Sequence, residues 1–198
     1  TTFRFQGNIP DVGIRAHPLK KLINAGVLGW PLRFTISSSN GFPWKLDMWR
    51  GRTDLVSEPV PARLDYDMWL GPAPYKPYHP HRVHQSFRGY WDYDGGGLGD
   101  QGQHFVDPVQ YLLGKDNTSP VEIEAEGPVQ HPDAAGPWRQ VWMRYADGCE
   151  IVLAGEDDRK DPPFIECPAG KIYQDFRSDI PNLEKTVESL PDPEPMET

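Results

Sequence analysis

The sequence predicts an α+β domain in which an open, mostly antiparallel β-sheet carries a few helices on one face. Three observations lead to this prediction. Short runs of alternating or apolar residues are separated by tight-turn residues, which is typical of antiparallel strands. The dipeptide Asp147-Gly148 stands between two such runs and predicts a hairpin. Few segments show the spacing of amphipathic helices, so helices are the minor component.

The predicted elements follow one another along the whole chain. A strand is expected over residues 2–6, a helix over 17–25 and a second strand over 32–38. A central helix follows the glycine-rich turn of residues 95–99, and its apolar stripe consists of Phe105, Val109, Leu112 and Leu113. Further strands are then predicted over residues 121–126, 139–145, 150–154, 164–167 and 171–175. A short helix over 182–190 closes the domain.

Length and composition fit one domain over residues 1–190 with a frayed polar tail at 191–198. The net charge of −9 and the lack of a basic cluster argue against nucleic acid or an anionic membrane surface as a partner. No apolar run approaches the ~20 residues that a membrane span needs. We therefore expect a soluble protein. The sequence leaves its compartment open, with the cytoplasm preferred. Cys149 and Cys167 are expected to be reduced thiols in the sheet, with pairing as the alternative.

Residues 65–94 form a long segment, rich in aromatic residues and proline, that we expect to be a functional loop. Its composition suits stacking on a ring-shaped ligand or packing over a sheet. Three histidines, His79, His81 and His84, could form a metal site. No thiolate lies near them in the sequence, and prolines fix the local geometry. A polar loop without a metal is therefore the favoured interpretation.

The central helix carries the candidate catalytic residues. Asp100, His104 and Asp107 stand at positions i, i+4 and i+7, so they share one helix face. His104 would exchange a proton with a substrate hydroxyl or carbonyl. Asp100 would orient the imidazole or bind the substrate. Asp107, on the next turn of the helix, would support these two residues. The structural alternative is that Asp100 caps the helix and His104 is an interface residue.

The same stretch contains a G-x-G-x-x-G pattern formed by Gly97, Gly99 and Gly102. A dinucleotide-binding site needs a buried strand before this pattern, within a βαβ unit. The preceding residues 90–94 do not predict such a strand. We therefore interpret the glycines as a tight turn beside a ligand and expect no cofactor-binding residues in this chain.

Several motifs of this chain occur together in one known family. In chain order they are Trp69-Leu-Gly-Pro-Ala-Pro74, Tyr90-Trp91 and Asp100-x-Gly-x-His104-x-x-Asp107. Together they resemble the second domain of the Gfo/Idh/MocA-like oxidoreductases, the glucose–fructose oxidoreductase and inositol dehydrogenase type. The likeness covers most of residues 10–175. It implies an open antiparallel sheet that carries the substrate side of an active site and an oligomer interface.

The resemblance also implies an activity, and it implies which domain holds the cofactor and which holds the substrate. The parent protein would be an NAD(P)-dependent oxidoreductase acting on a secondary alcohol of a sugar, polyol or derivative. NAD or NADP would be held by an N-terminal Rossmann domain, which this sequence lacks, so we expect an excised C-terminal domain that is inactive alone. By resemblance the catalytic residues are His104 and Asp100, and the substrate-binding residues are Asp107, Trp69, Tyr90 and Trp91.

Two alternative functions remain at this stage. The chain could be a stand-alone sheet domain that binds a carbohydrate or a protein, or a family member that uses transient oxidation to cleave a glycosidic bond. A homodimer or larger assembly through the sheet is also predicted, because four apolar residues are expected on its exposed face: Phe34, Ile36, Trp142 and Ile151. The sequence leaves the substrate, the choice between NAD and NADP, and the direction of reaction open.

Overall fold

The computed structural model describes residues 16–37, 49–155 and 161–193 of the chain. The contacts divide the chain into two compact units. Unit 1 comprises Thr1–Phe42, Gln103–Glu126 and Arg139–Thr198, and unit 2 comprises Pro43–Gly102 and Gly127–Trp138. The strand predicted over 2–6 lies outside the described residues. Within the described residues, no helix has both the length and the apolar character that crossing a membrane requires.

Among its described residues, unit 1 contains a six-stranded sheet in the order β2-β3-β4-β1-β5-β6. Its strands are β1 (Arg33–Ser37), β2 (Glu122–Glu126), β3 (Gln140–Arg144), β4 (Glu150–Ala154), β5 (Ile165–Cys167) and β6 (Gly170–Ile172). The predicted α+β fold with a mostly antiparallel sheet is confirmed, since four of the five neighbouring pairs are antiparallel. The pair β1–β4 is parallel. These two strands are far apart in sequence, so the chain between them can make the long crossover that parallel pairing requires.

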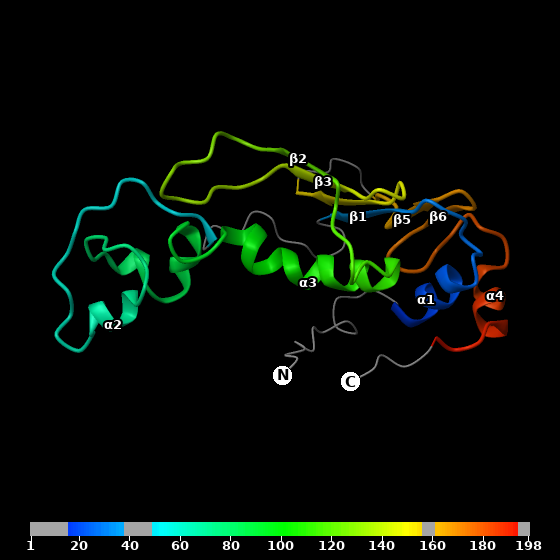
Figure 1. Cartoon of the computed structure of the whole chain (residues 1–198), viewed down its shortest axis with the longest axis horizontal. Helices are drawn as coiled ribbons and strands as arrows, with labels where there is room; N and C mark the ends of the chain where they lie inside the picture. Colours follow the sequence, from blue (N-terminus) through cyan, green and yellow to red (C-terminus); the bar gives the residue numbers. More distant parts are fainter. Residues whose placement is uncertain (1–15, 38–48, 156–160, 194–198) are drawn as a thin grey trace. The chain divides into compact units, whose positions relative to one another are not determined.

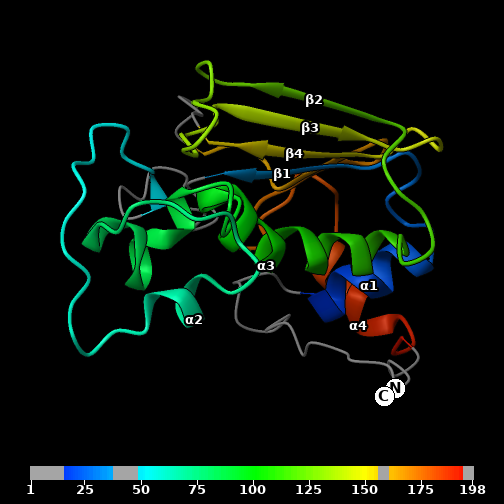
Figure 2. The same cartoon turned by 60° about the vertical axis from the view of Figure 1, so that its left-hand side comes forward.

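Helices cover one side of this sheet, as Figures 1 and 2 both show for α1 (Ala16–Asn24), α4 (Leu183–Ser189) and the later turns of α3 (Gly96–Leu113). The predicted apolar stripe of the central helix is buried, with Val109 and Leu112 fully enclosed. Lys20 on α1 donates from Nζ to the carbonyls of Tyr111 and Leu112, at 2.8 and 3.1 Å. These bonds satisfy carbonyls at the C-terminal end of α3, where a helix has no acceptor partners of its own.

The sheet face that was predicted to need a partner is covered within the chain. Phe34, Ile36 and Ile151 are at most 1% exposed. The register pairs Phe34 with Ile151 but Trp142 with Val152, one position further along β4. Because side chains alternate along a strand, Trp142 points to the opposite face from the other three. The prediction that these residues share one exposed face is therefore wrong, and the homodimer prediction loses their support.

The long aromatic segment of unit 2 contains regular secondary structure. The prediction that residues 65–94 form one long loop is therefore wrong. The segment holds α2 (Tyr66–Leu70) and two 3₁₀ helices, η3 (Pro80–Arg82) and η4 (His84–Gly89). Asp65 caps α2 by accepting a 3.0 Å hydrogen bond from the Met68 backbone N–H. A core forms from buried and partly buried residues: Leu64, Tyr66, Trp69, Leu70, Tyr78, Val83 and Tyr93.

A polar network fixes this segment to residues 127–138. Tyr90 is completely buried, and its hydroxyl lies 2.7 Å from His81 Nδ1. The Arg82 guanidinium lies over the Tyr90 ring, 4.4 Å from its centroid, and donates to Asp133 at 2.5 Å. Asp133 also accepts from Lys76 Nζ at 3.0 Å.

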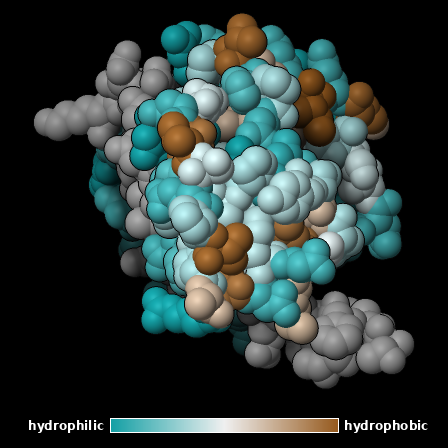
Figure 3. All heavy atoms as spheres, turned by 90° about the vertical axis from the view of Figure 1, so that its left-hand side faces the viewer, coloured by the Kyte–Doolittle hydropathy of each residue, from teal (hydrophilic) through white to brown (hydrophobic). Residues whose placement is uncertain are grey.

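On the face shown in Figure 3, which carries α2, hydrophobic residues occur as separate spots in a largely hydrophilic surface.

The central helix begins earlier than predicted. Gly96, which has a φ of +68°, starts α3, so the glycines at 97 and 99 lie inside the helix and do not form the expected turn. The Asp94 carboxylate accepts from the Gly95 N–H at 2.6 Å just before this start. A Cβ at Gly96 would come within 2.8 Å of the Ala135 Cβ. Close packing therefore requires glycine at position 96, although glycine has a low helix propensity.

Both cysteines are free thiols. Cys149 is fully buried, and the Leu32 N–H donates to its sulfur at 3.4 Å. Burial raises the pKa of the Cys149 thiol to about 11. A thiol protonated at neutral pH is a poor nucleophile, so Cys149 serves as a packing residue of the sheet.

Candidate functional site

Helix α3 presents the three predicted polar residues in sequence order along one face. His104 and Asp107 are exposed, and Asp100 is partly buried. Asp100 lies in the second turn, because the helix already begins at Gly96. The structural alternative that Asp100 is the N-cap is therefore wrong. An exposed imidazole one turn after a held carboxylate can meet a substrate hydroxyl from solvent.

Asp100 is held by two donors within unit 2. Arg88 Nε donates to Oδ1 at 2.9 Å, and Gln101 Nε2 donates to Oδ2 at 2.9 Å. Arg88 is itself fixed, because its Nη1 donates to the Gln85 carbonyl at 3.3 Å. Both carboxylate oxygens of Asp100 thus have defined directions, which is what a residue that orients a substrate needs.

Pro108 changes the backbone beside His104. It lies inside α3, four residues after His104. Proline has no N–H, so the His104 carbonyl lacks the hydrogen bond that an uninterrupted α-helix would give it. The helix is therefore less rigidly bonded at the position that carries the candidate proton-transfer group.

A cavity of about 410 Å³ lies next to Asp100 in unit 2. Its lining residues are Leu64, Trp69, Val83, His84, Gln85, Phe87 and Arg88. Trp69 stacks on Tyr66, with centroids 5.8 Å apart and planes 12° apart, and meets Tyr93 edge-on at 5.1 Å. The cavity thus combines a fixed aromatic wall with polar groups. This composition is typical of small-molecule sites.

Of the four predicted substrate-binding residues, Trp69 lines this cavity, whereas Asp107, Tyr90 and Trp91 do not. The Tyr90 ring is buried in unit 2. Trp91 is 38% exposed, and its Nε1 donates to the His131 carbonyl at 2.9 Å. Sequence reasoning missed Phe87 and Arg88 as site residues. The sequence signal for them was their position near the end of the aromatic-rich segment of residues 65–94, shortly before the central helix.

The three histidines of the 79–84 segment have separate local roles. His79 Nδ1 accepts from the His81 N–H at 2.9 Å, while His81 Nδ1 pairs with the Tyr90 hydroxyl. Burial, reinforced by the nearby Arg52 charge, lowers the pKa of the His81 imidazole. His84 lines the cavity. Among the residues that the structure describes, no group of three or more His, Cys, Asp or Glu side chains is placed to hold a metal ion.

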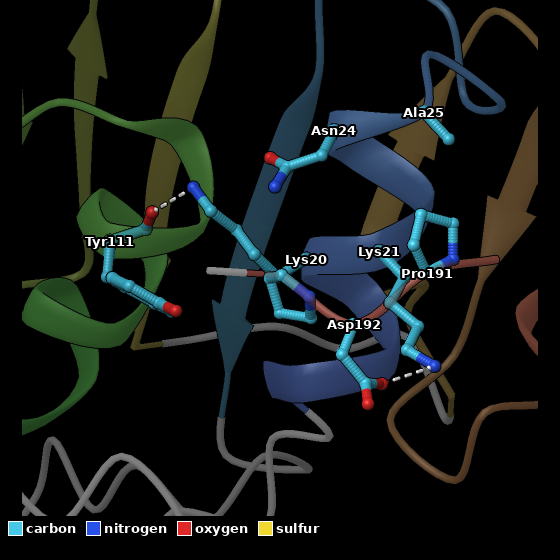
Figure 4. Close-up of a pocket in the computed structure, with 8 residues that line it drawn as sticks. Lys20, Lys21, Asn24, Ala25, Tyr111, Pro191 and Asp192 are labelled. Atoms are coloured by element: carbon cyan, nitrogen blue, oxygen red, sulfur yellow. Dashed lines mark hydrogen bonds and ion pairs between the residues drawn. The ribbon is translucent and has the colours of Figure 1, made fainter. Parts of the chain in front are cut away.

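A second concavity, of about 500 Å³, lies in unit 1 between α1, Tyr111 and residues 191–193 (Figure 4). Two lysines face it, but both are bonded to the chain itself. Lys20 donates to carbonyls of α3, and Lys21 pairs with Asp192 at 2.7 Å. Burial lowers the pKa of Lys20, with Asp116 acting in the opposite direction. Both lysines already have partners within the chain. We therefore interpret these contacts as structural ones that hold the ends of α1 and α3 in place.

Comparison with protein families shows which family the chain matches. The model of a Gfo/Idh/MocA-type family, described as "Oxidoreductase family, C-terminal alpha/beta domain", matches residues 12–198. The match includes the helix that carries Asp100 and His104, all of unit 2 and unit 1 from residue 12 onward. A search of curated proteins found no match.

Proposed function

The chain belongs to this oxidoreductase family, as its C-terminal alpha/beta domain, and we propose that it forms the substrate side of an NAD(P)-dependent enzyme. The substrate would be a secondary alcohol of a sugar, polyol or derivative. The observation that carries the proposal is the exposed His104 on the same helix face as the doubly held carboxylate of Asp100. This arrangement suits proton exchange with a hydroxyl whose direction is fixed.

Oxidation of a secondary alcohol removes a proton from oxygen and a hydride from carbon, and the residues of this chain fit only the first task. His104 would take the hydroxyl proton. Asp100 would orient the imidazole of His104 or bind the substrate. Asp107, one turn beyond His104, would bind a neighbouring hydroxyl.

The glycine pattern of this chain does not fit a dinucleotide. Gly97, Gly99 and Gly102 lie within α3, whereas a phosphate-binding fingerprint occupies the turn between a strand and a helix. We assign no residue here to NAD or NADP. Under the proposal, the cofactor is held by an N-terminal domain, and the isolated chain is inactive. A homodimer through the sheet stays a prediction that sedimentation velocity can check.

The proposal is tested by replacing His104 with Ala in the protein expressed from the complete gene. Loss of a general acid–base group typically lowers kcat by about 10²- to 10⁴-fold, and we expect that loss. Asp107→Asn should raise KM more than it lowers kcat. The matched control is Asp116→Asn, an exposed acid beyond the end of α3, which should leave both constants unchanged. Unaltered turnover in His104→Ala would refute the catalytic role.

A further inference from the structure

We infer that β2, at the edge of the sheet, is a docking strand for an extended segment of another protein in which basic and aliphatic residues alternate. The bound segment would add one strand to the sheet and pair with β2 through its main chain. The strand lies wholly within unit 1, and it shares no residue with the helix that carries Asp100 and His104. Its test is therefore independent of the proposed function.

The two edges of the sheet differ in how the chain treats them. The outer strands are β2 and β6. The chain itself closes the β6 edge, because the Lys171 carbonyl accepts from the Asp179 N–H at 3.3 Å and from the Ser178 hydroxyl at 2.8 Å. The Asp179 carboxylate also accepts from the Lys171 N–H at 2.6 Å. Over the described part of the chain, β2 pairs with β3 alone, and Figure 2 shows it as the outermost strand.

The hydrogen bonds of β2 show which of its backbone groups face outward. The Glu126 carbonyl accepts from the Arg139 N–H at 2.8 Å, so Glu126 directs its backbone groups toward β3. Backbone direction alternates along an antiparallel strand, so the other two glutamates of β2 face β3 as well. Ile123 and Ala125 therefore direct their N–H and C=O groups away from the sheet. An added strand pairs with outward groups of this kind.

The apolar face of β2 continues the core side of the sheet beyond its cover. The register places Ile123 beside Met143, and Met143 beside Ile151. Ile151 is fully buried, whereas Ile123 is 64% exposed and Val121, directly before the strand, is 69% exposed. Large aliphatic side chains are thus left uncovered at this edge. A partner strand with aliphatic residues at alternate positions would pack beside them.

The opposite face of β2 carries three glutamates, each with a side chain more than half exposed: Glu122, Glu124 and Glu126. Arg139 pairs with Glu126 at 3.4 Å. Arg144 is shared by three carboxylates, those of the other two glutamates and of Glu150 on β4, at 3.1, 3.2 and 3.1 Å. Opposite charges at facing positions stabilise a strand pair and like charges destabilise it. A basic partner is therefore favoured over a second β2, which would set glutamates against glutamates.

The other interpretation of these glutamates is that they only protect the edge from pairing, as charges on edge strands do. Protection is strongest where a charge points inward on the apolar face. Here all three charges lie on one face and leave the other face aliphatic. The net charge of −9 also attracts a basic segment at long range. These features favour docking, and the two interpretations predict different binding.

The first test titrates the chain with the peptide acetyl-Arg-Val-Arg-Ile-Arg-amide and follows backbone amides by heteronuclear NMR. We expect saturable shifts, largest at Ile123 and Ala125, and slower hydrogen exchange at these two amides. The acidic analogue acetyl-Glu-Val-Glu-Ile-Glu-amide should bind roughly 3- to 30-fold more weakly. The same should hold for the block peptide acetyl-Arg-Arg-Arg-Val-Ile-amide, which has the same composition without alternation. Equal binding of the three peptides, or no shift along β2, would overturn the inference.

The second test separates main-chain pairing from charge. Ala125→Pro removes an outward N–H that β3 does not use, and it should weaken binding of the basic peptide by about 3- to 10-fold. Ala125→Val keeps the N–H and should bind the peptide at least as tightly as the wild-type chain. If Ala125→Pro does not fold, a basic peptide N-methylated at alternate amides decides the same point, because the protein is then unchanged. Binding unaffected by the loss of these N–H groups would rule out strand addition.

The charge is tested with Glu124→Lys, which should weaken the basic peptide by roughly 2- to 5-fold and strengthen the acidic one. Its matched control is Glu184→Lys, an exposed acid of α4 with the same change in net charge. If both variants alter binding equally, the attraction is only that of the net charge and β2 is not the docking strand.

Discussion

At the scale of single residues, the Arg82–Asp133 pair of unit 2 is a partly buried ion pair whose loss should destabilise the fold. Arg82 is only 8% exposed, and its guanidinium donates to Asp133 at 2.5 Å. Asp133→Ala would leave a buried cation without its carboxylate. We expect the free energy of unfolding to fall by roughly 2–3 kcal/mol, measured by urea denaturation followed through tryptophan fluorescence.

The loss of stability in Asp133→Ala should depend on pH, because the Arg82–Asp133 contact changes the pKa of Asp133. The Arg82 hydrogen bond, with that of Lys76 and against burial, holds the pKa of Asp133 below its usual value. A carboxyl whose folded pKa is depressed stabilises the fold above its unfolded pKa, which is about 3.9 for Asp. The difference between wild type and Asp133→Ala should therefore be full at neutral pH and shrink as pH falls below about 4. Asp54→Ala, which breaks a similar but exposed pair with Arg52, should change stability little. An equal effect of both variants would show that burial is not the cause.

At the scale of elements, the sequence predicted what depends on local periodicity. The strands predicted within the described residues appear within three residues of their predicted bounds, and the Asp147-Gly148 turn joins β3 to β4. The parallel pairing of β1 with β4 was not predictable, because it depends on register between segments more than 100 residues apart. The start of α3 was mispredicted because glycine disfavours helices, whereas close approach to Ala135 requires it there.

For the candidate site too, the sequence predicted the local pattern but not the contacts between distant residues. Asp100, His104 and Asp107 were found because a helical period of 3.6 places them together, and this signal lies within eight residues. Arg88, 12 residues before Asp100, becomes a site residue only when η4 brings it back to α3. Tyr90 matched the family motif, yet burial gives it a core position. Motif and periodicity therefore identify the helix, and only tertiary structure identifies the cavity.

The glycines of α3 give a prediction at this scale. Gly99 is an exposed helical position, and a Cβ there would lie 3.4 Å from the Asp94 carboxylate, an ordinary contact. Gly99→Ala should raise the free energy of unfolding by about 0.5–1 kcal/mol, because glycine loses more backbone entropy than alanine. Gly96→Ala should destabilise, since its φ is +68° and its Cβ would collide with Ala135. Thermal unfolding of the two variants checks this pair, and a Gly96→Ala protein as stable as Gly99→Ala would contradict it.

At the scale of the whole molecule, each unit has its own stabilising charge pair. In unit 1, Lys115 is 8% exposed, donates to Asp147 at 2.5 Å and lies 4.8 Å from the Tyr145 ring centroid. In unit 2, Arg82 and Asp133 have the equivalent role. The two pairs have no residue in common. Compact units of this kind can open locally as separate cooperative segments, although α3 runs from one unit into the other.

Native-state hydrogen exchange can test whether the units open separately, using one backbone amide in each. The Glu150 N–H, bonded to the Leu32 carbonyl at 3.0 Å, reports on unit 1, and the Ala135 N–H, bonded to the Gly89 carbonyl at 2.9 Å, reports on unit 2. Lys115→Ala should speed exchange at Glu150 and leave Ala135 near its wild-type rate, because the lost contact joins the segment after α3 to the β3–β4 turn of unit 1. Asp133→Ala should do the reverse. Equal acceleration of both amides by either variant would show that α3 couples the two units into one cooperative folding unit.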